Sequence, residues 1–299
     1  MLTQNNKILI TGCGGMLGEA VHNHFQGKYE VLATDIDLNE KWLSYLDVRD
    51  KDAAHRVVAD FQPDAIVHLA ALTDMEFCEQ EVINAYKTNT ESVQFLSREA
   101  SNLEIPFVYI STAGIFDGNK DEYEEDCLPN PLSIYGKSKY YGERVALSIP
   151  KSIVVRAGWM MGGGPMKDKK FISKVIRQIA GGAKELFIVS DKLGTPCYTY
   201  DLAGSIAYLL ENDKFGIYHG ACKGSASRYE VAEYLLELLS KTNEVHLKEV
   251  DSDYFSKDYF APRPYSEKLV NTALERLESG LTRDWKICLK EYVNRFDWL

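Results

Sequence analysis

Residues 7–18 read Lys-Ile-Leu-Ile-Thr-Gly-Cys-Gly-Gly-Met-Leu-Gly, and this stretch decides the fold. The apolar run Lys7–Thr11 predicts a short buried strand. The glycine-rich segment after it leads directly into a helical pattern that continues to about Phe25. A second predicted strand, residues 29–35, ends on Asp35. A strand, a helix and a second strand within about 30 residues indicate a β-α-β unit.

The spacing Gly12-x-x-Gly15-x-x-Gly18 predicts a dinucleotide-binding turn. The backbone of such a turn bends sharply and passes close to a pyrophosphate, and larger side chains would block that approach. Met16 and Leu17 stand at the start of the predicted helix, where free N–H groups and the helix dipole favour a phosphate. An ordinary glycine-rich turn is the alternative, but it does not explain the position of the glycines inside a β-α-β unit.

Asp35 bears on the choice of cofactor. An acid at the end of the second strand can bond the ribose hydroxyls of adenosine, and it should repel a 2′-phosphate. No arginine stands directly beside Asp35, so we expect NADH or NADPH as the cofactor, with Asp35 favouring NADH. Asp47 and Val48 fall where an adenine edge could be held, with a solvated turn as the alternative.

Strand and helix patterns continue to alternate, which predicts a Rossmann-type doubly wound parallel sheet with helices on both faces. We expect residues 1–156 to form a dinucleotide-binding domain, with residues 200–220 returning to its sheet. Residues 157–199 and 221–299 are expected to form a smaller α+β substrate-binding lobe. The other predicted strands are residues 65–71, 107–112, 152–156, 186–189 and 216–219, and the other predicted helices are residues 52–61, 79–102 (one or two helices), 133–147, 169–180, 200–210, 228–239, 266–277 and 284–295.

The composition argues against several classes of partner. The 299 residues carry a formal net charge of −10 and no Lys/Arg run, which disfavours a nucleic-acid-binding surface. No apolar run approaches the ~18 residues of a membrane span, and the start has no signal-peptide core. None of the six cysteines forms a Cys-x-x-Cys pair, and their gaps fit no zinc pattern. We therefore expect reduced thiols, no metal and a cytoplasmic protein.

Tyr135 and Lys139 stand four residues apart in a segment that Ser133 can cap as a helix. This spacing places both side chains on one helix face. A tyrosine hydroxyl normally keeps its proton until pH ~10, and a cation beside it lowers that pKa. Thr112 ends the preceding strand, at the sheet edge that also holds the glycine turn. The three groups can converge into a site that exchanges a proton with a substrate oxygen.

Short motifs spread over nearly the whole chain carry a resemblance to a known family. They are the glycine turn, His68-Leu69-Ala70-Ala71-Leu72-Thr73, Ser111-Thr112, Phe116-Asp117-Gly118, residues 130–139, Gly142-Glu143, Arg156-Ala157-Gly158-Trp159, Gly194-Thr195-Pro196, Asp201-Leu202-Ala203, Gly216-Ile217-Tyr218-His219 and Arg263-Pro264. In this order they resemble the extended short-chain dehydrogenase/reductase family, and within it the branch of dTDP-4-dehydrorhamnose reductases.

The resemblance implies a role for each of the three polar groups. Thr112 would polarise the keto oxygen of a nucleotide-linked sugar, and Tyr135 would protonate it. Lys139 would lower the pKa of Tyr135 and hold the nicotinamide ribose.

The same resemblance extends the predicted site. Ala70 and Ala71 are expected in the cofactor site, and Thr73 in the substrate site. Trp159 is expected beside the sugar, with a role as a core aromatic as an equal alternative. Arg263 is expected near the nucleotide diphosphate, whose oxygens a planar guanidinium can bind bidentately.

The chain departs from the reductase branch at substrate-facing positions. The branch usually has Asp-Tyr after the catalytic Thr, and Ala113-Gly114 stand there. It tends to have Thr-Ser before the Trp and a Tyr soon after, and Ala157-Gly158 and Met161 take those places. Ala113-Gly114 also argue against a 4,6-dehydratase, whose pattern has an acidic pair there. These departures leave the identity of the sugar open.

The expected function is the NAD(P)H-dependent reduction of the 4-keto group of a nucleotide-linked 6-deoxysugar, as in dTDP-4-dehydrorhamnose to dTDP-L-rhamnose. One alternative is a nucleotide-sugar 4-epimerase that keeps its NAD tightly bound. Another is a non-catalytic, dinucleotide-binding regulatory subunit of the same fold. The expected partner is a small nucleotide-sugar substrate, and a homodimer is left open.

Overall fold

A seven-stranded parallel sheet forms the centre of the computed structural model, which describes residues 2–3, 5–278 and 280–298. The strand order is β11-β6-β5-β4-β1-β2-β3, so the chain starts near the middle and changes direction between β1 and β4. This order confirms the predicted Rossmann-type doubly wound sheet. The strands are β1 (Lys7–Thr11), β2 (Glu30–Asp35), β3 (Ser44–Tyr45), β4 (Ala65–His68), β5 (Phe107–Thr112), β6 (Ser152–Ala157) and β11 (Gly216–His219), and all neighbouring pairs run parallel.

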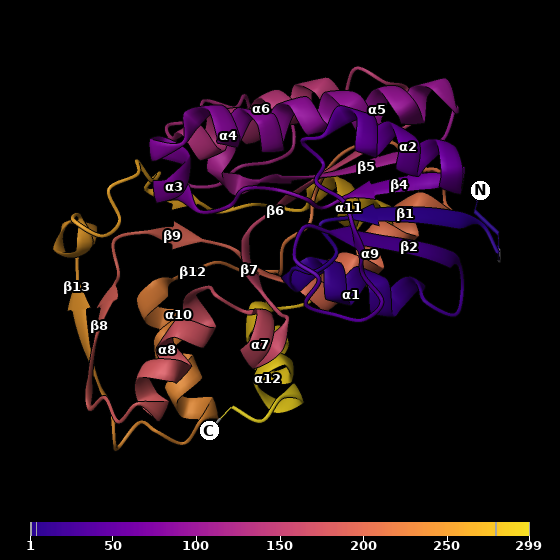
Figure 1. Cartoon of the computed structure of the whole chain (residues 1–299). Helices are drawn as coiled ribbons and strands as arrows, with labels where there is room; N and C mark the ends of the chain where they lie inside the picture. The colour runs from indigo at the N-terminus through magenta and orange to yellow at the C-terminus, as the bar shows by residue number, and fades with distance from the viewer. Residues whose placement is uncertain (1, 4, 279, 299) are drawn as a thin grey trace.

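Helices cover both faces of the sheet (Figure 1). Strands β4 and β6 are buried along their whole length, as expected for parallel strands covered on both sides. One face packs against α2 (Lys51–Phe61), α5 (Ser92–Asn102) and α6 (Ile134–Ala146), and the other packs against α1 (Met16–Phe25), α9 (Thr199–Glu211) and α11 (Thr272–Leu277).

A π-helical turn holds α6 against the sheet. The region predicted as one or two helices divides into α3 (Met75–Gln80), α4 (Val82–Tyr86), a π-helix (Lys87–Glu91) and α5. The Tyr109 hydroxyl on β5 donates toward the carbonyl of Asn89, at 3.2 Å, and that of Lys139, at 3.1 Å. A Cβ on Gly142 would lie 2.2 Å from the Asn89 oxygen, so only glycine allows this close approach. These contacts fix the turn of α6 that carries Lys139.

The predicted smaller lobe contains a separate apolar cluster, which includes Ile176, Leu235 and Tyr292. Its cluster lies apart from the two that line the sheet. Its strands are β7 (Trp159–Met161) paired with β10 (Pro196–Tyr198), β9 (Leu193–Gly194) between β12 (Ala226–Ser227) and β14 (Ser266–Glu267), and β8 (Glu185–Val189) paired with β13 (His246–Val250). Its helices are α7 (Gly164–Lys167), α8 (Phe171–Ala180), α10 (Arg228–Leu238) and α12 (Trp285–Arg295), and a short 3₁₀ turn lies at Ser252–Phe255. Another 3₁₀ turn, Ala113–Ile115, directly follows the sheet strand β5.

The helix predicted over residues 266–277 is wrong in its first half. Ser266 and Glu267 form β14, which pairs with Leu193 and Gly194 of β9, and only Thr272–Leu277 is helical. A further bridge joins Leu269 to Tyr123. Pairing with segments distant in sequence therefore overrides the local helical pattern. The strand β13, which pairs with β8, was not predicted.

Two general features bear on the class of protein. All six cysteines are unpaired, and five of them are buried. In the part of the chain that the structure describes, no helix combines the length and the apolar character needed to cross a membrane.

Candidate active site

A cleft of about 1570 Å³ opens where the carboxyl ends of the central strands face the smaller lobe. This is the edge at which open α/β sheets bind ligands. Every residue that the sequence predicted for the site lines this cleft, although the roles assigned to them stay predictions. These residues are Gly12, Gly15, Met16, Leu17, Gly18, Asp35, Asp47, Val48, Ala70, Ala71, Thr73, Thr112, Tyr135, Lys139, Trp159 and Arg263.

The glycine turn connects β1 to α1, and its glycines serve different purposes. Gly12 has φ +71°, and a Cβ there would lie 2.3 Å from the Ala70 nitrogen. A Cβ on Gly18 would lie 2.3 Å from the Cys13 oxygen. A Cβ on Gly15 would meet only the Gly12 oxygen, at 3.7 Å, so the fold itself does not require glycine there. No side chain caps α1, which leaves its first N–H groups free to bind an anion at the cleft.

Asp35 lies at the end of β2, where its carboxylate is held by backbone groups. It accepts hydrogen bonds from the Gly14 N–H at 2.9 Å and from the Asp37 N–H at 2.9 Å. Asp47 is engaged by Arg49, whose Nη2 and Nε donate to it at 2.7 Å and 2.9 Å. The side-chain hydrogen bonds from Arg49 lower the pKa of Asp47. This end of the cleft therefore presents the carboxylate of Asp35, and the Arg49 guanidinium is already paired with Asp47.

Thr112 and Tyr135 lie side by side in the wall of the cleft. Ser133 caps α6 by accepting from the Gly136 N–H at 3.0 Å, as predicted, and this starts the helix one residue before Tyr135. Thr112 Oγ1 accepts from the Gly114 N–H at 3.1 Å, which leaves the hydroxyl proton free to be donated. Burial in the cleft wall raises the pKa of Tyr135 to about 12, although a hydrogen bond with Thr112 opposes that rise.

Lys139 lies one helical turn beyond Tyr135 and is buried. Its Nζ lies 4.2 Å from the centre of the Tyr109 ring, a cation–π contact. Burial lowers the pKa of Lys139 to about 7, against the charges of Glu143 and Cys78, which raise it. The expected lowering of the Tyr135 pKa by Lys139 is not found, because burial dominates and the Tyr135 pKa rises instead.

Glu267 lines the cleft beside Thr112 and Tyr135. A Cβ on Gly114 would lie 3.5 Å from Glu267 Oε1, 3.5 Å from Thr112 Oγ1 and 3.7 Å from Tyr135 Cε1, so these three side chains approach the same side of Gly114. Glu267 Oε2 accepts from Trp159 Nε1 at 2.8 Å. Burial raises the pKa of Glu267, and the hydrogen bond from Trp159 and the nearby cations oppose that rise.

Arg228 covers the other side of Trp159. Its guanidinium carbon lies 3.7 Å from the centre of the Trp159 ring. Arg228 lines the cleft, and among the described residues none accepts a hydrogen bond from its guanidinium. Arg263, by contrast, pairs with Glu76 at 2.7 Å and donates to the Ala261 carbonyl at 2.9 Å.

The family described as RmlD substrate binding domain matches residues 6–298. The chain belongs to this family. It is 33% identical to the spore coat polysaccharide biosynthesis protein SpsK of Bacillus subtilis, with 96% of each chain covered. It is 32% identical to a dTDP-4-dehydrorhamnose reductase of Aggregatibacter actinomycetemcomitans, over 95% of this chain and 97% of that protein.

Solved structures of dTDP-4-dehydrorhamnose reductases share the whole fold. A dTDP-4-dehydrorhamnose reductase from Clostridium acetobutylicum superposes with a TM-score of 0.87 at 32% identity, over 97% of this chain and 99% of that one. A Bacillus anthracis dTDP-4-dehydrorhamnose reductase, solved in complex with NADP, gives a TM-score of 0.87 at 28% identity, over 98% and 100% of the two chains. A different kind of relative is the methionine adenosyltransferase 2 subunit beta of Xenopus tropicalis, 26% identical over 95% of this chain and 86% of that protein.

Two residues of this RmlD-family site were missed by the sequence interpretation, namely Glu267 and Arg228. Glu267 was placed inside a predicted helix, and Arg228 was treated only as the start of one. The available signal was indirect: Ala113-Gly114 replace a bulky polar pair of the reductase branch, so another side chain could reach that space.

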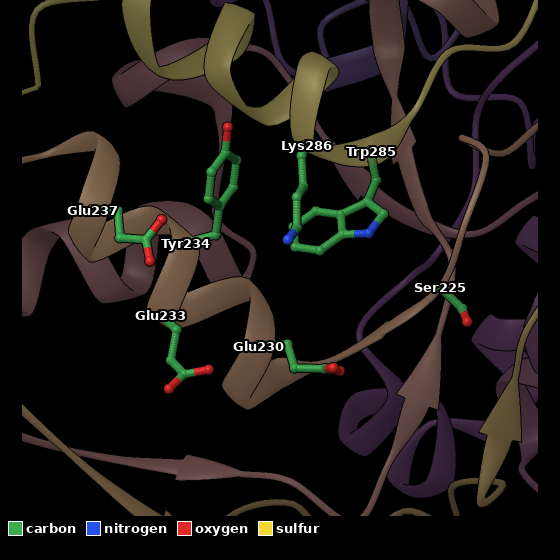
Figure 2. A pocket seen from close by; sticks show the side chains of 7 residues that line it. All are labelled: Ser225, Glu230, Glu233, Tyr234, Glu237, Trp285 and Lys286. Carbon is green, nitrogen blue, oxygen red and sulfur yellow. The ribbon is translucent and has the colours of Figure 1, made fainter.

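A second, smaller hollow of about 370 Å³ shares no residue with the cleft. Figure 2 shows the carboxylates of Glu230, Glu233 and Glu237 along α10, with those of Glu230 and Glu233 below the Tyr234 and Trp285 rings. Glu230 accepts from the Ser227 N–H at 2.7 Å and so belongs to the cap of α10. None of the predicted site residues of this RmlD-family chain lies there. The residues that line it are Ser225, Glu230, Glu233, Tyr234, Glu237, Trp285 and Lys286.

Proposed function

We propose that this RmlD-family protein reduces the 4-keto group of a nucleotide-linked 6-deoxysugar, as in the conversion of dTDP-4-dehydrorhamnose to dTDP-L-rhamnose. The observation that carries the proposal is the meeting of Thr112 and Tyr135 in the cleft that also holds the glycine turn. Similarity to proteins named dTDP-4-dehydrorhamnose reductase over nearly the whole chain supports it.

The proposed cofactor is a nicotinamide dinucleotide, with NADH preferred. The open space at Gly15 and the uncapped start of α1 fit a pyrophosphate. Asp35 is suited to bond ribose hydroxyls, and its charge would repel a 2′-phosphate. Arg49, which could otherwise attract that phosphate, is paired with Asp47.

A bound nicotinamide dinucleotide supplies the hydride, and the protein directs the proton. Tyr135 stays protonated at neutral pH because its pKa is raised, so it can donate to the keto oxygen as negative charge develops there. The Thr112 hydroxyl, already accepting from Gly114, donates a second hydrogen bond to the same oxygen. Lys139, which lies one helical turn beyond Tyr135 on α6 and has a pKa of about 7, would hold the nicotinamide ribose.

The test is a direct assay of turnover. The protein is mixed with dTDP-4-dehydrorhamnose and either NADH or NADPH, the nicotinamide absorbance is followed, and the sugar product is identified by NMR. We expect stoichiometric oxidation of the cofactor and a new alcohol at C4. If 4-keto sugars linked to dTDP, UDP and GDP all leave both cofactors reduced, the proposal fails.

A second candidate is a regulatory subunit that keeps the dinucleotide site without turnover. The observation that favours it is the similarity to proteins named methionine adenosyltransferase 2 subunit beta. Ala113, Gly114, Ala157 and Gly158 also lack the polar groups of the reductase branch. Stable co-purification with a methionine adenosyltransferase, together with no reduction of any 4-keto sugar, would favour this candidate. A 4-epimerase would instead purify with bound NAD and consume no NADH.

A further inference from the structure

Glu267 is a carboxylate that the proposed reaction leaves without a role, although it lies beside the reacting groups. Its Oε1 and the side chains of Thr112 and Tyr135 all approach the position that a Cβ on Gly114 would occupy, at 3.5 to 3.7 Å. Its charge also acts on the hydroxyl of Tyr135, whose pKa it raises. The three groups therefore face one small volume of the cleft, the volume in which a keto oxygen would be protonated.

The two oxygens of Glu267 differ in what they contact. Oε2 accepts from Trp159 Nε1 at 2.8 Å, and this bond fixes the orientation of the carboxylate. Oε1 has no hydrogen-bond or ion-pair partner among the described residues, and Glu267 lines the cleft. An oriented acceptor with one unused oxygen is what a site needs to bind a donor on a ligand.

The chemistry of the proposed substrate identifies that donor. When Thr112 and Tyr135 hold the oxygen at C4, the neighbouring ring atoms are C5, which carries a methyl group, and C3, which carries a hydroxyl. An ionised carboxylate only accepts hydrogen bonds, so it matches a hydroxyl and not a methyl group. Arg228, Arg263 and Lys192 lie close enough for their charges to favour the ionised form of Glu267.

We propose that Glu267 is a specificity-determining residue that accepts a hydrogen bond from the C3 hydroxyl of the sugar. This contact positions the C4 carbonyl against Thr112 and Tyr135, and it selects sugars that keep a hydroxyl next to the keto carbon. Gly114 stands where the reductase branch usually has a tyrosine, and its lack of a side chain leaves room for the contact between Glu267 and the sugar. The inference rests on the proposed function for the placement of C4.

The test compares two ligands in binding, so it does not depend on turnover. Wild-type protein is titrated calorimetrically with dTDP-L-rhamnose and with its 3-deoxy analogue, in the presence of the dinucleotide. A hydrogen bond to a charged acceptor predicts a preference for the 3-hydroxy ligand of roughly 10- to 100-fold. Glu267→Ala should reduce this preference to about threefold or less by removing the proposed acceptor.

The matched control is Glu249→Ala, which removes an exposed carboxylate of β13 that does not line the cleft. It should retain the wild-type preference. If Glu267 had a purely structural role, its removal would weaken the binding of both ligands equally and leave the ratio of their affinities unchanged. That result would overturn the inference. Equal binding of the two ligands by the wild type, or no binding of either, would overturn it as well.

If Glu267→Ala fails to fold, as judged by its binding of the dinucleotide, Trp159→Phe replaces it. That variant keeps the carboxylate but removes the N–H that orients it, and the preference should again fall. An unchanged preference in a folded Trp159→Phe protein would overturn the inference. A protein that discriminates the two ligands but never oxidises NADH or NADPH would contradict the proposed reduction while supporting the role of Glu267.

Discussion

The indole N–H of Trp159 donates to the Glu267 carboxylate across 2.8 Å, joining residues 108 positions apart in the chain. Trp159 begins β7, two residues after the sheet strand β6 ends at Ala157, and Glu267 belongs to β14. Arg228 stacks on one side of the same indole, and a Cβ on Gly194 would lie 2.3 Å from it. The ring is thus fixed between two parts of the smaller lobe, and it fixes the carboxylate in turn.

Trp159→Phe should show how much this bond contributes. The change removes the donor and leaves Glu267 Oε2 without its partner in a partly buried place. We expect the free energy of unfolding to fall by about 1–3 kcal/mol. We also expect kcat/KM to fall roughly tenfold, mainly through a higher KM, because Glu267 would lose its fixed orientation beside the proposed sugar site. Urea denaturation and steady-state kinetics measure the two effects.

The matched control for that variant is Trp298→Phe. The Trp298 indole nitrogen is buried and finds no hydrogen-bond partner among the described residues, so removing its N–H breaks no such bond. The control should keep the wild-type kcat/KM. A loss of similar size in both variants would show that the Trp159–Glu267 bond is not the cause.

Tyr135→Phe removes a single hydroxyl from the centre of the cleft. We expect kcat to fall by about 10²- to 10⁴-fold, the usual contribution of a positioned proton donor. Cofactor affinity should hardly change, because the aromatic ring and Lys139 remain. Stopped-flow oxidation of NADH and fluorescence titration of NADH separate the two quantities. Tyr141→Phe, at an exposed position of the same helix, is the control, and near-normal turnover in Tyr135→Phe would remove Tyr135 as the donor.

Lys139 should make stability depend on pH in a defined window. Its pKa is lowered by burial from 10.5 to about 7 in the folded protein. Between about pH 7 and 10 the unfolded chain therefore holds a proton that the folded protein has lost, so this group makes stability rise with pH across that window. Below about pH 7 both states are protonated and the burial cost of the charge is complete.

Lys139→Met removes this titration. The variant should exceed the wild type in free energy of unfolding most at about pH 7 and below, and the difference should shrink steadily toward about pH 9 to 10. Urea denaturation of both proteins at a series of pH values gives the difference directly, and other titrating groups cancel in it. A difference that is constant or grows with pH would mean that burial does not lower the pKa of Lys139 in the folded protein.

The sequence predicted the sheet and the cleft because both follow from local patterns. Alternating apolar runs specify parallel strands, and polar residues at their carboxyl ends must meet at one edge. Glu267 could not be found in this way, because a two-residue strand is decided by pairing with Leu193 and Gly194, which local sequence does not contain. The Tyr135 pKa was predicted in the wrong direction because the spacing to Lys139 says nothing of burial, and burial is the larger effect.

Two glycines of the turn should respond differently to alanine. Gly12→Ala places a Cβ 2.3 Å from the Ala70 nitrogen at φ +71°, so we expect a loss of at least ~2 kcal/mol in the free energy of unfolding. Gly15→Ala meets nothing closer than 3.7 Å, so its stability should change by no more than about 0.5–1 kcal/mol. Its added methyl group would nevertheless face the pyrophosphate, and NADH affinity should fall roughly tenfold or more. Full NADH affinity in a stable Gly15→Ala protein would contradict the placement of the pyrophosphate.

Asp35→Asn should change the choice between cofactors. The carboxylate accepts from the Gly14 N–H at Oδ2 and from the Asp37 N–H at Oδ1, and an amide keeps the shape and one of these two bonds while removing the charge that repels a 2′-phosphate. We expect the ratio of kcat/KM for NADPH to that for NADH to rise about tenfold, with most of the change in the KM of NADPH. Asp52→Asn, an exposed acid on α2, removes the same charge elsewhere and should leave the ratio unchanged. If the ratio stays at its wild-type value in Asp35→Asn, the discrimination lies elsewhere, and the Asp47–Arg49 pair at the same end of the cleft becomes the next residue pair to vary.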